Sequence, residues 1–209
     1  EVMLPATEFQ TDGCEIKILF RPAEELAGDL YGLDHRGDRI IFWVCDVTGH
    51  GVASSFVASV VRESLAINAG ETLFGCDEPR PDKTLKFVSN NVFKAVKRRF
   101  YATMSLAVVD MSTKMISVAN AAHHYPILFR DNKLFKGMAR HIFNGPLIGQ
   151  PLDENDSRVF SYKTGHFPLQ PNDSFLFFTD GINEASFDDE SEQYGVRRMK
   201  RFIKKNLTN

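Results

Sequence analysis

Runs of apolar residues that end in acidic or glycine-containing turns divide the chain into its expected elements. Residues 40–47 (IIFWVCDV) are apolar, β-branched or aromatic almost throughout, which indicates a strand buried on both faces. Gly49 and Gly51 then mark a turn. Residues 52–69 are dense in apolar and small side chains over about five turns at 3.6 residues per turn, which predicts a helix that faces the core.

The rest of the chain contains one more long helix and then mainly short strands. Apolar residues at helical spacing predict a second helix from Asp82, its expected N-cap, to about Arg99. Shorter runs predict strands at residues 104–110, 115–121, 126–130 and 174–181, followed by a closing helix at 194–206. No repeat or linker divides the chain, so residues 1–209 are expected to form one α/β (α+β) domain, with helices covering packed antiparallel sheets.

We expect a single hydrophobic core to join these sheets to the first helix. Such a core forms where the apolar faces of neighbouring elements are buried against each other. Its predicted members come from three of the strands and the first helix: Val44, Phe56, Val60, Leu106, Val108, Phe175 and Phe177.

Composition and charge narrow the class of partner. The 209 residues are 43% hydrophobic and 25% charged, as in an ordinary globular protein. A net charge of -2 gives no general attraction to nucleic acid or to a membrane surface, so neither partner is expected. No apolar run reaches the roughly 18 residues of a membrane span. Cys14, Cys45 and Cys76 lie far apart without metal-site spacing, and we expect reduced thiols in a cytoplasmic protein.

Three acids beside glycines suggest a metal site. Asp29, Asp46 and Asp180 lie in the segments AGDLYG, DVTGHG and TDGINEA, and the last two segments follow apolar strands. Taken alone, each such pair is typical of a turn. Together, carboxylates at rigid strand ends offer the oxygen ligands that Mg²⁺ or Mn²⁺ prefers, and two such ions bridged by a carboxylate activate water for phosphoryl transfer.

The histidines are weaker candidates for this chemistry. His50, in a turn, is either a ligand, a general acid or a structural hydrogen-bonding group. The neighbours His123 and His124 suggest zinc at first sight, but adjacent residues of a strand point to opposite faces. A zinc site is therefore not expected.

Several segments, in order, resemble the motifs of the stage II sporulation protein E type of metal-dependent protein phosphatases (the PPM family). The first two are PAEELAGDLYG at residues 22–32 and DVTGHGVAS at residues 46–54. The others are SLAVVD (105–110), NAAHHYPILFR (120–130), GPLIG (145–149) and FFTDGINEA (177–185). The resemblance covers nearly the whole chain, and it rests on the shared order of these motifs.

The resemblance implies a fold and a set of site residues. The family fold is two packed antiparallel β-sheets flanked by helices. By this resemblance Asp29, Asp46 and Asp180 bind two Mn²⁺ or Mg²⁺ ions, with Asp46 bridging and the Val47 carbonyl as a further ligand. Asn120 and His123 support the site without binding metal. A metal-bound water is the nucleophile in this family, so no phospho-enzyme is expected.

The chain also departs from the family pattern. Gly32 stands where an acid is common, and Ala122 stands where a glycine is common. The usual closing Asp-Asp-x-Thr strand, with its metal-binding acid, is not reached before Asn209. The opening EVMLP resembles the end of a connector. We therefore expect a fragment of a larger protein with an upstream regulatory or receiver domain, and less activity than in a chain extended past Asn209.

Three alternative functions are compatible with these features. The first is a phosphatase that acts on phosphoserine or phosphothreonine of a small regulatory protein, typically an anti-anti-sigma factor. The second is a phosphatase-like binding module of a response-regulator adaptor, with little or no catalysis. The third is a structural domain whose acids only form turns. A homodimer is left open.

Overall fold

The computed structural model describes residues 7–11, 13–21, 28–49, 51–97, 99–135, 137–151, 161–186 and 193–206. The largest sheet has the strand order β10-β6-β5-β4-β3, and β9 pairs with β6 in parallel. The bounds of these strands are β3 (Asp29–Arg36), β4 (Arg39–Val47), β5 (Ala102–Asp110), β6 (Met115–Ala121), β9 (Asn144–Gly145) and β10 (Gly165–Pro168).

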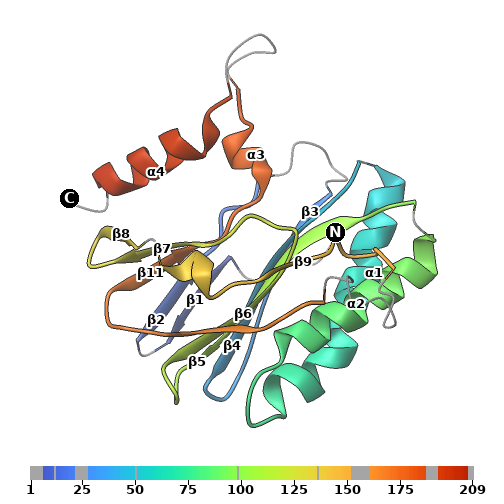
Figure 1. Ribbon diagram of the computed structural model, residues 1–209, viewed down its shortest axis with the longest axis horizontal. Coiled ribbons are helices and arrows are strands. Elements are labelled where there is room, and N and C mark those ends of the chain that lie inside the picture. Colours follow the sequence, from blue (N-terminus) through green and yellow to red (C-terminus); the bar gives the residue numbers. More distant parts are fainter. Residues whose placement is uncertain are drawn as a thin grey trace.

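Smaller sheets and helices complete the domain (Figure 1). One sheet contains β11, β7 and β8 in that order, and a separate hairpin pairs β1 with β2. The strand bounds are β1 (Glu8–Thr11), β2 (Cys14–Lys17), β7 (Ile127–Arg130), β8 (Lys133–Phe135) and β11 (Asp173–Leu176). The helices are α1 (Val52–Ala69), η1 (Gly70–Phe74), α2 (Pro81–Val96), η2 (Met138–Arg140), α3 (Asp180–Asn183) and α4 (Gly195–Asn206).

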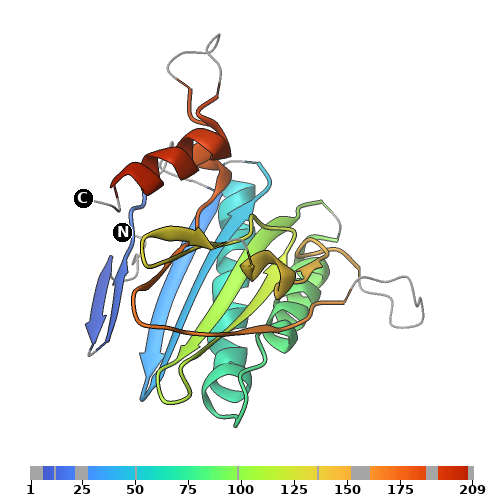
Figure 2. The same ribbon diagram turned by 60° about the vertical axis from the view of Figure 1, so that its left-hand side comes forward.

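The strands and helices pack in layers. Helices α1 and α2 cover one face of the large sheet, and the three-stranded sheet lies on its other face (Figures 1 and 2). Helix α4 packs its Met199 against Ile127 and Phe129 of β7 and against Phe178. This arrangement confirms the predicted fold of packed antiparallel sheets flanked by helices.

Alternation along β4 divides the core into two main clusters. Ile41, Trp43 and Cys45 join Val57, Val61 and Leu65 of α1 in the cluster between sheet and helices. Phe42 and Phe177 belong to the cluster on the opposite face, between the sheets. The predicted single core is therefore wrong, because successive strand residues point to opposite faces. Leu106, Val108 and Val60 lie in the first cluster and Phe175 in the second.

Three further expectations need correction. Phe56 is not a core residue: its side chain is 54% exposed, and the neighbouring Val57 is buried instead. Asp82 is not the N-cap of α2, because the cap is Arg80 and the helix begins with Pro81, whose fixed φ suits a first helical position. The strand expected at residues 174–181 ends at Leu176.

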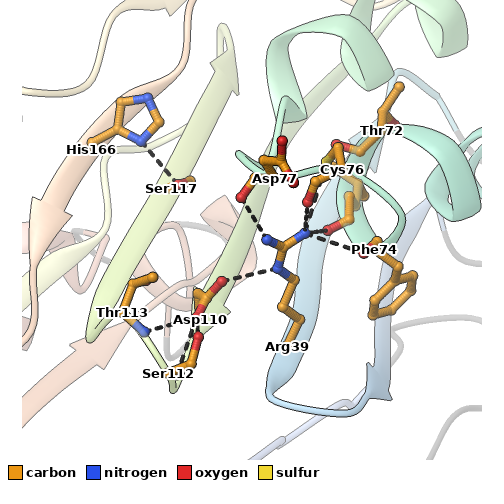
Figure 3. A network of polar contacts seen from close by, with 11 residues as sticks. Arg39, Thr72, Phe74, Cys76, Asp77, Asp110, Ser112, Thr113, Ser117 and His166 are labelled. Carbon is orange, nitrogen blue, oxygen red and sulfur yellow. Dashed lines mark hydrogen bonds and ion pairs between the residues drawn. The ribbon is translucent and has the colours of Figure 1, made fainter.

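Arg39 fixes the connection between α1 and α2 to the large sheet (Figure 3). Its Nε donates to Asp110 Oδ2 at 2.9 Å, and its Nη atoms donate to four backbone carbonyls of residues 73–77. Burial raises the pKa of Asp110, but hydrogen bonds from Ser112, Thr113 and Arg39 outweigh it and hold this pKa below its ordinary value. Asp110 is therefore ionised at neutral pH and pairs with Arg39.

Two observations apply only to the residues that the structure describes. Among them, no helix combines the length and apolar character needed to cross a membrane. Cys14, Cys45 and Cys76 are free thiols, as expected from their spacing.

Candidate active site

Strand pairing brings two of the three predicted acids into one row. In the β3–β4 hairpin Asp29 is the cross-strand partner of Asp46, and Asp46 is in turn the partner of Thr103 on β5. Directly paired residues of antiparallel strands point to the same face. The pairing of Met104 with Ala121 places Ala122 next in this row, just beyond β6. The row therefore lies at one end of the large sheet.

A close backbone approach links Val47 to the start of β3. The Val47 amide donates to the Gly28 carbonyl at 3.1 Å. A Cβ on Gly28 would lie only 2.5 Å from the Val47 carbonyl oxygen, so only glycine fits here. The carbonyl expected to act as a ligand is thereby held against the residue that precedes Asp29.

The segment before α3 brings the third acid to this row. Thr179 Oγ1 donates to Asp29 Oδ2 at 2.8 Å across 150 residues of sequence. Asp180 follows as the first residue of α3, and a Cβ on Gly181 would meet Asp29 Oδ2 at 3.8 Å. The structure thus gathers all three predicted acids, with Asp180 at a helix start rather than at a strand end.

Negative charge accumulates where Asp180 meets the row of Asp29 and Asp46. Burial, together with the smaller effects of the carboxylates of Asp180, Asp29 and Glu184, raises the pKa of Asp46 to about 6. Burial also raises the pKa of Asp29, with a smaller contribution from Asp180, although the hydrogen bond from Thr179 opposes the shift. Acids that raise the pKa of one another in this way favour a cation among them.

His123 connects the row to the Asp180 segment. Its Nδ1 lies 2.7 Å from Thr103 Oγ1, and its Nε2 lies 3.0 Å from the Phe178 carbonyl oxygen. Because a carbonyl only accepts, Nε2 carries the proton and Nδ1 accepts from Thr103. Burial lowers the pKa of His123 to about 4, so the ring is neutral at pH 7 and holds the residues next to Asp180.

The Asn120 side chain holds the backbone of His123 in place. This fully buried side chain donates from Nδ2 to the His123 carbonyl oxygen at 2.7 Å and to Asn144 Oδ1 at 2.9 Å. Its fixed position orients the turn that carries His123. The geometry agrees with the supporting roles implied for Asn120 and His123.

His123 and His124 follow β6 and do not lie within a strand, so the predicted opposite orientation does not apply. Their ring centroids are 5.9 Å apart, and His124 stacks on Phe178 at 5.1 Å. Both nitrogens of His123 are already hydrogen-bonded to Thr103 and to the Phe178 carbonyl. His123 is thus unsuited to binding zinc in this arrangement.

These residues surround a pocket of about 220 Å³, lined by Asp46, Thr103, Ala122, His123, His124 and Asp180. Over the described ranges, no three His, Cys, Asp or Glu side chains are grouped closely enough to enclose an ion. Mg²⁺ and Mn²⁺ do not need such a cage, because Mg²⁺ in particular keeps several waters and binds through one or two carboxylates. The oxygen-rich, negatively charged lining therefore fits these hard cations and not softer ones.

Sequence reasoning missed part of the site. Thr103 and Thr179 hold His123 and Asp29, but a threonine in a strand or turn gives no signal of its own. Glu184 was also missed, although it lies in the TDGINEA segment and acts on the pKa of Asp46. His50 and residues 22–27 of the first motif lie outside the described residues.

Comparison with known proteins identifies the family. The model of the stage II sporulation protein E (SpoIIE) family matches residues 36–209, which include Asp46 and Asp180. The chain belongs to the SpoIIE family. Protein IcfG of Synechocystis sp. is 24% identical over 217 residues, covering 93% of this chain and 32% of IcfG. Phosphoserine phosphatase RsbU of Bacillus subtilis is 24% identical over 178 residues, covering 84% of this chain and 48% of RsbU.

Solved structures share the fold of this SpoIIE-family chain. The SiaA-PP2C domain of Pseudomonas aeruginosa has a TM-score of 0.65 at 19% identity, covering 91% of this chain and 70% of that one. The RsbU and RsbW domains of Rv1364c from Mycobacterium tuberculosis give 0.63 at 20% identity, covering 89% and 47%. At these identities the likeness shows the fold alone. The chain spans about a third to a half of the length of IcfG and RsbU.

Proposed function

We propose that this domain is a Mn²⁺- or Mg²⁺-dependent protein serine/threonine phosphatase. The observation that carries the proposal is the row formed by Asp29 and Asp46, to which Thr179 ties the Asp180 segment. The likeness to a phosphoserine phosphatase supports it. As substrate we propose a small phosphorylated regulatory protein of the anti-anti-sigma type, under the control of an upstream regulatory or receiver domain.

Each site residue has a distinct part in this proposal. Asp29, Asp46, Asp180 and the Val47 carbonyl would hold two ions, with Asp46 shared between them. The chemistry that such ions supply when bound is Lewis acidity towards water and the phosphoryl group. The chain fixes the positions of these carboxylates and of this carbonyl, and water would supply the remaining oxygen ligands.

The remaining residues fix the geometry of the pocket. Thr179 orients the Asp29 carboxylate, and neutral His123 holds the backbone before Asp180. His124 and Thr103 line the space that a phosphoserine side chain would enter. Such preorganised groups contribute to catalysis because they need no rearrangement when charge develops on the phosphoryl group.

The test is the Asp46→Asn variant against a matched control. Wild-type protein should bind Mn²⁺ in a calorimetric titration, melt at a higher temperature in its presence, and hydrolyse a phosphoserine protein. Asp46→Asn should lose most Mn²⁺ binding and about a thousandfold or more in rate, several kcal/mol of transition-state stabilisation. Asp34→Asn, which alters an exposed acid on the same hairpin, should leave both unchanged.

A binding module would behave differently. It would show no Mn²⁺-dependent turnover even in a wild-type chain extended past Asn209, and its affinity for a partner would be the same in Asp46→Asn. That pair of results would refute the phosphatase proposal.

A further inference from the structure

Helix α4 carries an unusual concentration of positive charge. Its twelve residues, GVRRMKRFIKKN, include six Lys or Arg and no acid. Since the whole chain has 25 Lys and Arg against 27 Asp and Glu, the rest of the chain carries a formal charge of -8. Six positive charges without an acid are therefore concentrated on α4, whereas the rest of the chain is net negative.

The apolar side of α4 is already occupied by the domain. Met199 is buried against Ile127, Phe129 and Phe178, and Val196 and Ile203 pack against the same cluster. Arg197 and Arg201, which lie on the other side of the helix at i, i+4 spacing, are exposed. The basic side of α4 is thus exposed. The helix itself lies beside the three-stranded sheet (Figures 1 and 2).

Helix stability does not explain these charges. Lys204 and Lys205 near the C-terminus of α4 interact favourably with the helix dipole, but Arg197 in the first turn is opposed to it. Arg197 with Arg201, and Arg201 with Lys205, are also like-charge pairs at i, i+4, which destabilise a helix. A charge pattern that weakens its own helix indicates a role in binding.

The helix is also close to the candidate active site. Phe178, on which Met199 packs, precedes Thr179 and Asp180 directly, and its carbonyl accepts the hydrogen bond from His123. Helix α3, which begins at Asp180, contacts α4. A partner held on α4 would therefore lie beside the pocket.

We propose that the basic face of α4, centred on Arg197 and Arg201, docks an acidic segment of the protein partner whose phosphoserine enters the pocket. This inference rests on the proposed phosphatase function for the identity of the partner. Insertion into a membrane is disfavoured because the apolar face of α4 is buried in the domain, whereas membrane-surface helices bury that face in lipid. Phe202, 62% exposed beside Arg201, offers one apolar contact to a protein segment.

The test measures docking without catalysis. A fluorescently labelled, glutamate-rich peptide without phosphate is titrated with the protein in EDTA, beside the same peptide with glutamine at each glutamate. The glutamate peptide should bind about tenfold more tightly, and its affinity should fall as salt is raised. Equal binding of the two peptides would overturn the proposal.

Two charge-reversal variants locate the effect. Arg197→Glu with Arg201→Glu should weaken binding of the glutamate peptide about tenfold. It should not lower the melting temperature, because it replaces one like-charge pair (197 and 201) by another, turns the pair of residue 201 with Lys205 into an attractive one, and removes the unfavourable dipole interaction at residue 197. Lys83→Glu with Lys94→Glu makes the same change of net charge on exposed positions of α2 and should leave the affinity nearly unchanged. Equal losses in both variants would overturn the proposal.

Competing polyanions complete the experiment. If phosphatidylserine vesicles or single-stranded DNA bind more tightly than the peptide, the face serves a membrane or nucleic acid, and the proposal is refuted. Because the peptide carries no phosphate and EDTA removes the metal, failure of docking leaves the phosphatase proposal intact. Conversely, loss of turnover in Asp46→Asn does not affect the docking result.

Discussion

Replacing Ala122 by glycine is expected to stabilise the domain by about 0.5–1 kcal/mol, although the change removes a methyl group from the lining of the pocket. Ala122 has φ 51°, in the left-handed region. There the Cβ of an L-residue lies too close to the following carbonyl oxygen, which costs about 1–2 kcal/mol. Glycine avoids this strain but increases the entropy of the unfolded chain, at a cost of about 0.4–1 kcal/mol. The difference favours glycine.

Urea denaturation, followed by the fluorescence of the single, buried Trp43, would measure this difference. The matched control is Ala121→Gly, one residue earlier. Ala121 is fully buried in strand β6 and is not among the residues with positive φ. Its replacement removes packing without relieving strain and should destabilise the domain by about 1 kcal/mol or more. If Ala122→Gly destabilised the domain as much as Ala121→Gly, the argument from strain would be refuted.

Ala122→Gly also tests whether an alanine, in place of the glycine common in the family, affects the metal site. The Ala122 amide donates to the Gly145 carbonyl at 3.1 Å, and this hydrogen bond does not require a side chain. The position of Asp46 in the row should therefore be preserved. Mn²⁺ affinity in Ala122→Gly is expected to equal that of the wild type, as measured by calorimetric titration.

Two further substitutions test the packing around the site. Arg39→Met should destabilise the domain by about 3–5 kcal/mol in urea denaturation, because it leaves buried Asp110 without its cation. The loss of stability should be full above about pH 4 and should shrink at lower pH as Asp110 is protonated. A loss under about 1 kcal/mol would contradict this prediction. Gly32→Asp should destabilise the domain by about 3 kcal/mol or more in a thermal melt, because a Cβ at this position would lie 2.3 Å from the Trp43 ring. If this clash is the cause, adding Trp43→Ala should relieve part of the loss.

The elements that the sequence predicts best are those with long, uniform patterns. The predicted strand at residues 40–47 and helix at residues 52–69 are confirmed as β4 and α1. The error at Phe56 arises because α1 is apolar around much of its circumference, so the pattern does not reveal which side meets the sheet. The expected strand at residues 174–181 ends early because Leu176 pairs with Ile127, the first residue of β7.

The positions of Asp29 and Asp46 follow from the hairpin alone. Arg36 pairs with Arg39 across a turn that contains Gly37, whose φ is 57°, and that pairing fixes Asp29 opposite Asp46. The contact of the Asp180 segment depends instead on long-range hydrogen bonds, such as that from Thr179 to Asp29, which no local pattern encodes. The sequence therefore identifies the acids, and the tertiary fold is needed to bring the third to the other two.

The two single-residue departures from the family pattern, Gly32 and Ala122, have opposite structural meanings. Gly32 is required here, because it is the cross-strand partner of Trp43 and the indole fills the space of a side chain. Gly32 also lies three residues from Asp29 along β3, so an acid there would point to the opposite face, away from the row. Ala122, in contrast, is tolerated at a cost in strain where glycine would fit without any. A single substitution at each position distinguishes the two cases: Gly32→Asp should lower the stability of the domain, and Ala122→Gly should raise it.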